Sequence, residues 1–225
     1  MNEFITIIFN LFMLPFEKFI LHKRRKELIS KANGNVLEIG PGGGINFNYY
    51  NPKNIISLKV TDLKFNKFIL NHKLNKQINI DYIIASAENL PFKDKSFDTV
   101  IVTLTLCAID NPNKALSEIH RVLKQDGKLI FIEHVLPHDK FCCNLAHALN
   151  NTWKKICKCN LNRDTYKNIE NANFKITNYE RFGNKVFVFI KGIAYKKLKN
   201  NYILPLTTIN LPLTLNSFTK KTWRI

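Results

Sequence analysis

Glu38 and the glycines that follow it are the residues of this chain whose types and spacing best suit ligand binding. The stretch from Val36 to Gly44 reads as a short apolar run ending in a glycine cluster, with Gly40, Gly42 and Gly44 at alternate positions. Such glycines let the backbone take positive φ and approach a ligand with no Cβ in the way. Dinucleotide-binding turns and tight turns without a ligand use a similar spacing. Glu38 favours a cationic ligand, because a carboxylate beside the turn would repel a pyrophosphate.

A second acidic residue, Asp62, follows the apolar run at 55–60 and lies 22 positions after Gly40. At about this distance, an acidic side chain in α/β nucleotide-binding folds reaches the ribose hydroxyls, and one carboxylate can accept both hydroxyl hydrogens. Asp62 can also be the N-cap of a helix beginning near Lys64, and the two roles are compatible. The sulfonium and α-amino groups of S-adenosylmethionine are cations of the kind that Glu38 suits.

An α/β fold would bring these residues to one edge of a sheet. Continuous apolar runs predict buried parallel strands, and helical spacing predicts crossover helices between them. The glycine turn should lead into a helix whose free N–H groups face the ligand. We expect a doubly wound, seven-stranded, mostly parallel sheet whose last strand is antiparallel. The predicted strands after the first are 55–60, 80–85, 97–102, 128–135, 174–181 and 186–195, and the predicted helices are 16–29, 65–74, 112–124, 141–156 and 165–172.

The composition is that of one globular domain with an excess of positive charge. The chain has 225 residues, 45% of them hydrophobic, and a net charge of +17. The charge reflects either a compositional bias, since Asn, Lys and Ile are all abundant, or an attraction to nucleic acid or anionic lipid. Five cysteines at irregular spacing predict reduced thiols in a cytosol, without a disulfide framework or a metal site. We divide the chain into an amphipathic N-terminal helical cap (1–33), a cofactor-binding domain (34–197) and a basic C-terminal extension (198–225).

The N-terminal segment combines an apolar stretch with a basic amphipathic helix. Residues 4–14 are almost wholly apolar but too few to span a bilayer, and they lack the features of a signal peptide. The helix predicted at 16–29 has a basic face. It either covers the cofactor across the sheet edge or lies on an anionic membrane surface.

The order of the motifs resembles class I S-adenosylmethionine-dependent methyltransferases of the ubiquinone-biosynthesis-like type. The resemblance covers about residues 10–197 and rests on Glu38 to Gly44, Asp62, 86–92, Phe97-Asp98 and 118–129. Other stretches resemble the branch of methyltransferase-like thiol methyltransferases and their bacterial relatives: 14–17, 104–107, Glu133-His134-Val135 and 159–165. Gly43 stands where the family usually has Thr, and Ser86 stands where relatives often carry Asp, Asn or Ala.

The resemblance implies that S-adenosylmethionine is the cosubstrate and that no metal takes part. In this fold, the loop after the third strand holds the adenine, and the carboxyl ends of the strands face the ligand. The implied cofactor-binding residues are Glu38, Gly40, Gly42, Gly44, Asp62, Ser86, Ala87, Glu88 and Thr103.

His134, near the carboxyl end of the strand at 128–135, is the residue we favour as a catalytic base. Its alternative role is that of a packed strand histidine. Cys107 lies at the sheet edge where the methyl group would be, although a buried small hydrophobe is the commoner role of a cysteine. A relay of thiolates, of the kind used in arsenic methylation, would need partner cysteines near Cys107. The sequence alone cannot place Cys142 or Cys159 there.

We expect the methyl acceptor to be a small apolar molecule or a lipid, with a thiol ahead of an amine. A thiol needs only to become a thiolate, and enzymes that methylate base amines usually carry an Asn/Asp-Pro-Pro-aromatic loop that is absent after the strand at 97–102. The alternatives are a phosphatidylethanolamine-type lipid or quinone-precursor methyltransferase, a nucleic-acid methyltransferase, and a non-catalytic cofactor-binding protein. The expected location is the cytoplasm, with peripheral contact to anionic membranes as an option; the sequence leaves the oligomeric state open.

Overall fold

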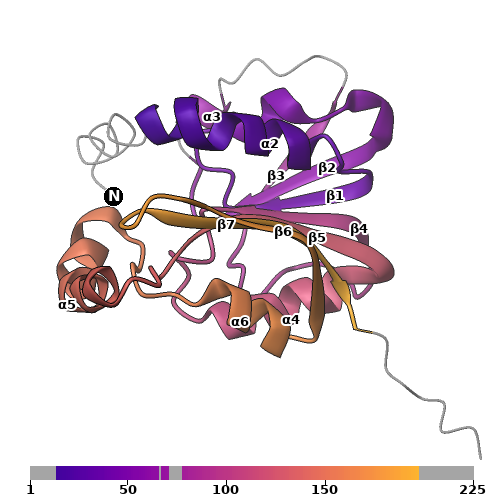
Figure 1. The fold of residues 1–225 in the computed structure, drawn as a ribbon. Helices are drawn as coiled ribbons and strands as arrows, with labels where there is room; N and C mark the ends of the chain where they lie inside the picture. Colours follow the sequence, from indigo (N-terminus) through magenta and orange to yellow (C-terminus); the bar gives the residue numbers. More distant parts are fainter. Residues whose placement is uncertain (1–13, 66, 71–77, 198–225) are drawn as a thin grey trace, which may run out of the picture.

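The computed structural model describes residues 14–65, 67–70 and 78–197, which form a seven-stranded sheet with helices on both faces (Figure 1). The strands lie in the order β3-β2-β1-β4-β5-β7-β6. β7 pairs antiparallel with β5 and β6, and the other pairs are parallel. The predicted sheet is therefore confirmed. The bounds are β1 (Gly34–Ile39), β2 (Ile55–Asp62), β3 (Ile80–Ile84), β4 (Phe97–Thr103), β5 (Leu123–Val135), β6 (Phe174–Gly183) and β7 (Val188–Lys196).

Polar residues at the helix starts determine where several helices begin. Each of α4, α5 and α6 follows an Asn or Asp whose side chain accepts a backbone N–H three residues further on: Asn111, Asp139 and Asp164. Such caps satisfy N–H groups that have no partner within the helix. The described helices are η1 (Glu17–Leu21), α2 (His22–Ile29), η2 (Ile45–Tyr49), η3 (Pro52–Asn54), α3 (Lys67–Leu70), α4 (Pro112–Val122), α5 (Lys140–Cys157) and α6 (Thr165–Asn171).

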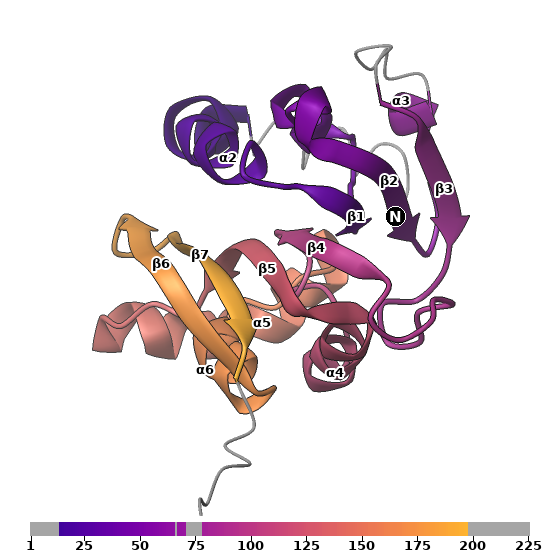
Figure 2. The ribbon, with the colours of Figure 1, turned by 90° about the vertical axis from the view of Figure 1, so that its right-hand side faces the viewer.

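The sheet is buried on both faces, which explains why its strands read as continuous apolar runs. Successive strand residues point to opposite faces, so Val36 and Leu37 belong to different cores. Leu28 and Ile29 of α2 pack into the core that contains Val36. Helices α4 and α6 cover the opposite face, on which Leu37 lies (Figure 2). This two-sided cover leaves the strand ends as the place for polar chemistry.

The N-terminal helix is attached to the sheet by ion pairs as well as by apolar contacts. Lys191 of β7 is buried, and its ammonium contacts Glu27 of α2 and, at 2.9 Å, Glu180 of β6. Arg24 donates to the same Glu180 carboxylate at 2.6 Å. Although burial disfavours its charged form, hydrogen bonds to Glu27 and Glu180 raise the pKa of Lys191. The helix predicted at 16–29 thus covers one face of the sheet.

Two sequence predictions need correction in length and type. The helix expected directly after the glycine turn is only a short 3₁₀ turn, Ile45–Tyr49, because the chain becomes extended at Tyr50 and Pro52 then starts another turn. Helix α4 ends at Val122, before the predicted end at 124, and β5 begins at Leu123 instead of at the predicted 128. Leu123 pairs with Phe97 of β4, and the ladder then shifts so that Lys128 pairs with Thr99. The extra residues of β5 form an irregularity in the ladder.

Several predictions concern residues outside the described part of the chain. Of the helix predicted at 65–74, the structure describes Lys67–Leu70 as α3. Most of the apolar stretch 4–14 and the extension 198–225 also lie outside the described residues. Among those that are described, no helix is long and apolar enough to cross a membrane.

Candidate functional site

The glycine turn after β1 borders a cavity of about 410 Å³ at the carboxyl edge of the sheet. Gly40, Gly42 and Gly44 have φ of 67°, 58° and 79°, so the predicted positive φ is confirmed. A Cβ on Gly40 would lie 2.5 Å from the Thr105 side chain, whereas nothing lies within 4 Å of a Cβ on Gly42. Gly40 is therefore required for packing against the next loop, and Gly42 leaves open space beside the cavity.

Asp62 and the loop after β3 form the opposite side of this cavity, together with Ser86, Ala87 and Glu88. Burial raises the pKa of the Asp62 carboxyl, and nearby backbone N–H donors offset only part of that effect. One of these donors is Lys64, whose N–H lies 3.4 Å from Asp62 Oδ1. No described helix begins at Lys64, so the N-cap role considered for Asp62 is wrong. Its carboxylate remains at the cavity.

Glu38 lies behind the glycine turn and is not among the residues that line the cavity. Its buried carboxylate accepts hydrogen bonds from Tyr50 Oη at 2.7 Å and Asn46 Nδ2 at 2.8 Å. Burial raises the pKa of Glu38, and these two hydrogen bonds oppose that effect. Asn46 Nδ2 also donates to Thr103 Oγ1 at 3.0 Å, and Arg25 donates to Asn46 Oδ1 at 2.8 Å. Glu38 thus connects β1 to the turn after it.

The cavity therefore brings together part of the predicted cofactor set. Glu38, Gly44 and Thr103 do not line it, and the cofactor contacts predicted for them stay predictions. Sequence reasoning missed Asn46, which joins Glu38 to Thr103, because a lone Asn after a glycine turn carries no distinguishing signal. It also missed other lining residues, which lie in the segments after the predicted strands 55–60 and 97–102: Leu63, Thr105, Ile109 and Asp110.

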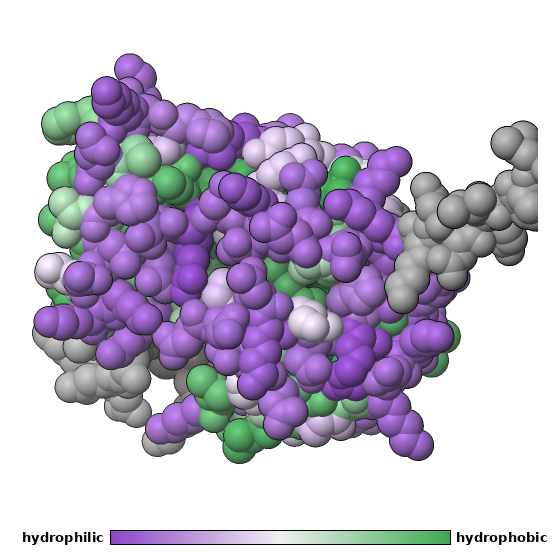
Figure 3. All heavy atoms as spheres, turned by 90° about the horizontal axis from the view of Figure 1, so that it is seen from below, coloured by the Kyte–Doolittle hydropathy of each residue, from purple (hydrophilic) through white to green (hydrophobic). Residues whose placement is uncertain are grey.

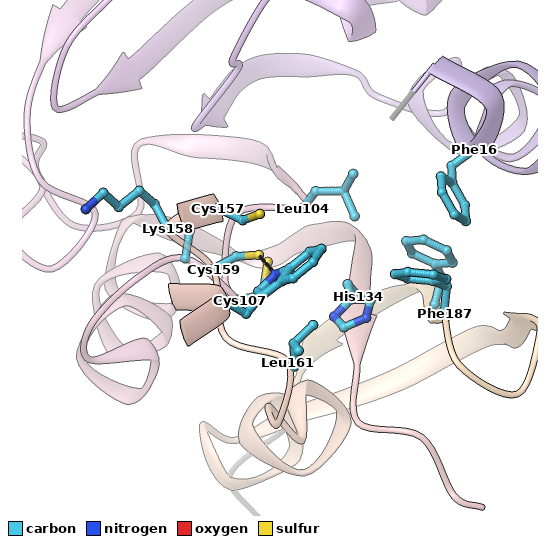
Figure 4. Close-up of a pocket in the computed structure, with 12 residues that line it drawn as sticks. Phe16, Leu104, Cys107, His134, Cys157, Lys158, Cys159, Leu161 and Phe187 are labelled. Atoms are coloured by element: carbon cyan, nitrogen blue, oxygen red, sulfur yellow. Dashed lines mark hydrogen bonds between the residues drawn. The ribbon is translucent and has the colours of Figure 1, made fainter. Parts of the chain in front are cut away.

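A second, mainly apolar cavity of about 160 Å³ lies next to the first. Leu104 and Ala108 line both cavities, so they form the wall between them. Figure 4 shows that the side chains lining the apolar cavity come from distant parts of the chain, among them Phe16 before η1 and Leu161 after α5. The N-terminal segment thus contributes Phe16 to this lining, and α5 contributes Trp153 and Cys157. The aromatic lining residues are Phe16, Trp153, Phe187 and Phe189.

A buried carboxylate holds the loop between the two cavities. Glu133 accepts backbone N–H groups from Thr105 at 2.9 Å and Leu106 at 3.1 Å through Oε1, and from Cys107 at 3.3 Å through Oε2. Burial raises the pKa of Glu133 to about 7, against the lowering effect of these donors. Leu104, at the start of the loop, has a φ of 55°. A side chain in this left-handed region needs support from its surroundings, which the Glu133 hydrogen bonds supply.

His134 lines the apolar cavity, where sequence reasoning expected a base. Its ring packs edge-on against Phe189 with 5.7 Å between centroids. Its Nδ1 is buried and has no hydrogen-bond partner among the described residues. Burial lowers the pKa of His134 to about 4, so the imidazole is neutral at pH 7. The described part of the chain contains no group of three or more His, Cys, Asp or Glu side chains that could hold a metal ion.

Known proteins resemble this chain in both sequence and fold. Residues 37–131 match a family model described as a methyltransferase domain. Thiol S-methyltransferase TMT1B of Rattus norvegicus is 35% identical, over 68% of this chain and 68% of that protein. Ubiquinone/menaquinone biosynthesis C-methyltransferase UbiE of Rickettsia prowazekii is 35% identical over 47% of this chain and 46% of that protein. The crystal structure of a SAM-dependent methyltransferase from Methanosarcina mazei is 19% identical with a TM-score of 0.58, covering 80% and 98% of the two chains.

Proposed function

The chain belongs to the S-adenosylmethionine-dependent methyltransferases, and from this premise we propose that it transfers the methyl group to a small apolar thiol. One observation carries the choice of acceptor: an apolar cavity shares Leu104 and Ala108 with the glycine-lined cavity. S-adenosylmethionine supplies an electrophilic methyl group on a cationic sulfur. Two cavities with a common wall suit a reaction that needs the acceptor, the methyl carbon and the sulfur in line.

The glycine-lined cavity suits S-adenosylmethionine. Gly42 leaves room for close approach of the cofactor, and Asp62 offers a carboxylate to ribose hydroxyls. The short loop Ser86 to Glu88 would border the adenine. Glu88 accepts the N–H of Asn111 at 3.0 Å, which holds this loop against the start of α4. We assign Glu38 to the support of the glycine turn and to the charge balance near the cationic end of the cofactor.

The apolar cavity suits a compact acceptor rather than a polymer. A cavity of about 160 Å³ bordered by Phe16, Trp153 and Phe189 suits an apolar body with one polar atom better than it suits a nucleic acid. A thiol loses less on leaving water than an amine or a hydroxyl does, because it forms weaker hydrogen bonds. The similarity to proteins named thiol S-methyltransferases supports the same choice.

His134 would contact the acceptor as a neutral imidazole. Its Nδ1 has no partner among the described residues, and its pKa of about 4 makes it a weak proton acceptor at pH 7. We therefore assign His134 the task of accepting a hydrogen bond from the acceptor and directing its sulfur toward Leu104, where the two cavities meet.

Peripheral membrane contact is a second proposal, and it would suit acceptors that partition into lipid. Helix α5 exposes a row of apolar side chains at helical spacing, with 75% of Phe141 and 53% of Ile156 exposed. Lysines such as Lys154 and Lys155 lie on the same helix. Figure 3 shows the neighbouring lower face, on which hydrophobic areas interrupt a mostly hydrophilic surface. A lipid or quinone-precursor acceptor is the alternative that this surface and the UbiE similarity favour.

The acceptor assignment is tested with methyl-labelled S-adenosylmethionine and a panel of alkyl thiols, aryl thiols, phenolic quinone precursors and phosphatidylethanolamine vesicles. We expect labelled thioethers from the thiols. Product from a phenol or from phosphatidylethanolamine with none from any thiol would overturn the assignment.

A pair of Leu→Phe variants then locates the acceptor. Leu161→Phe fills the apolar cavity and should raise the KM for the thiol while leaving cofactor affinity unchanged. Leu149→Phe makes the same change on α5, where Leu149 is 47% exposed and does not line the cavity, and should behave as the wild type. Equal effects of the two variants would argue against acceptor binding in this cavity.

A further inference from the structure

Three cysteines lie in the apolar cavity, and the function proposed above assigns none of them. Cys107 comes from the loop after β4, Cys157 from the end of α5, and Cys159 from the segment that follows (Figure 4). Cys107 and Cys159 hydrogen bond to each other through their side chains. Trp153 Nε1 donates to Cys159 Sγ at 3.1 Å. Cys159 is thus the sulfur on which two donors converge.

The backbone holds this pair of thiols in a fixed arrangement. The N–H and Nδ2 of Asn160 both donate to the carbonyl of Cys107, at 2.8 and 2.9 Å. Asn160 is buried, and its side-chain oxygen lies 3.4 Å from Asn150 Nδ2 of α5. On the other side, Glu133 accepts the N–H of Cys107. The two sulfurs therefore belong to rigidly connected segments, although they are 52 positions apart in the sequence.

The surroundings favour the proton on Cys107 and the negative charge on Cys159. The hydrogen bond to Cys159, burial and the nearby Glu133 carboxylate all raise the pKa of Cys107. The hydrogen bonds from Cys107 and Trp153 lower the pKa of Cys159 to about 7, against the effect of burial. The other titratable groups that line the cavity are His134, Cys157 and Lys158. Of these, His134 is neutral at pH 7 because burial lowers its pKa.

We infer that Cys159 is the catalytic base that takes the proton from the acceptor thiol in the apolar cavity. This inference rests on the proposed function. The acceptor's S–H bond breaks, its proton moves to the Cys159 thiolate, and the acceptor becomes a thiolate. That thiolate's electron pair forms a bond to the methyl carbon while the carbon–sulfonium bond breaks. The electron pair of the broken bond stays on the departing sulfur, giving S-adenosylhomocysteine and the methyl thioether. Cys159 then releases its proton to solvent.

The choice of Cys159 over His134 follows from the surroundings of each group. His134 Nδ1 is buried without a partner among the described residues, and no described carboxylate contacts this ring to stabilise a positive charge. Cys159 already has two donors that stabilise its charged form. His134 thus orients the acceptor, and Cys159 takes the proton.

The test compares an alkyl thiol, which is protonated at neutral pH, with a nitro-substituted aryl thiol, which is already ionised. Cys159→Ser should lower kcat/KM for the alkyl thiol by about 100-fold or more and change that for the aryl thiol by less than about threefold. Cys143→Ser, on α5 outside the cavity, is the matched control and should change neither. Equal losses for both thiols in Cys159→Ser would show a structural role only and overturn the inference.

A second readout needs no methyl acceptor and covers the case in which Cys159→Ser does not fold. The rate of iodoacetamide labelling at Cys159, followed by peptide mass spectrometry, should rise with a midpoint near pH 7, and Trp153→Phe should shift that midpoint upward. A midpoint near 9, the ordinary thiol value, would overturn the inference even if thiols are methylated. If no thiol is methylated, the proposed function fails and the catalytic role of Cys159 fails with it, whatever the labelling shows.

Discussion

Replacing Glu133 by Gln tests whether one buried carboxylate holds the loop that separates the two cavities. In the wild type, its two oxygens accept the N–H groups of Thr105, Leu106 and Cys107. Gln has nearly the same shape but only one acceptor oxygen, and its NH₂ would face a backbone donor. The variant therefore leaves at least one buried N–H unpaired, which should cost about 1–3 kcal/mol of unfolding free energy. The substitution also removes the ionisable group at position 133.

The pH dependence of the unfolding free energy gives a more specific prediction for Glu133. The pKa of Glu133 rises from 4.5 to about 7 on folding, mainly because the group is fully buried. Between these values the folded state holds a proton that the unfolded chain has released, so stability falls as the pH rises through this window. Integration of the linkage relation between about pH 5.5 and pH 8 gives a loss of about 2 kcal/mol from this group in the wild type.

Urea denaturation of wild type and Glu133→Gln at both pH values measures this loss. Other titrating groups contribute equally to the two proteins, so the difference in unfolding free energy between them isolates residue 133. We expect the wild type to lose its advantage over the variant by about 2 kcal/mol on going from pH 5.5 to pH 8. A difference that is the same at both pH values would refute a raised pKa at Glu133.

Other predictions address the cofactor site, the N-terminal helix and the membrane. Asp62→Ala should weaken binding of S-adenosylhomocysteine by about 1.5–3 kcal/mol in calorimetry, since ribose hydroxyls lose a charged partner; unchanged affinity would remove Asp62 from the site. Lys191→Met should lower the unfolding free energy by about 1–2 kcal/mol, because two partly exposed carboxylates lose the buried one of their cations. Lys31→Met, which removes an exposed pair with Glu27, should cost less than about 0.5 kcal/mol, and equal costs would argue against the buried network. The full chain should float with anionic liposomes in a salt-dependent way, at about 1 kcal/mol for each basic residue near the surface. Equal recovery of the protein with neutral and with anionic liposomes would indicate that its net charge reflects compositional bias and not attraction to membranes.

The strands and the glycine turn could be predicted from local pattern alone. A strand buried on both faces must be apolar at consecutive positions, as in the run Val100 to Val102, and a backbone at positive φ selects glycine, as at Gly42. The position of Asp62 could be predicted in a similar way. Parallel strands all end at the edge of the sheet where ligands bind, whichever strands they pair with. The limits of α4 were less predictable, since the pairing of Leu123 with Phe97 ends the helix early.

The sequence by itself determined the fold class, the glycine turn and the positions of Asp62 and His134 at strand ends, because each of these depends on residues close together in the chain. Only the tertiary structure decided the electrostatics of the site. The carboxylate of Glu38 is occupied by Asn46 and Tyr50, the ring of His134 is desolvated by its neighbours, and Cys107 meets Cys159 across 52 positions of sequence. Charge and proton affinity depend on how far water is excluded and on which donors lie within about 3 Å. Those conditions arise when distant segments pack together, and no local pattern of residues records them.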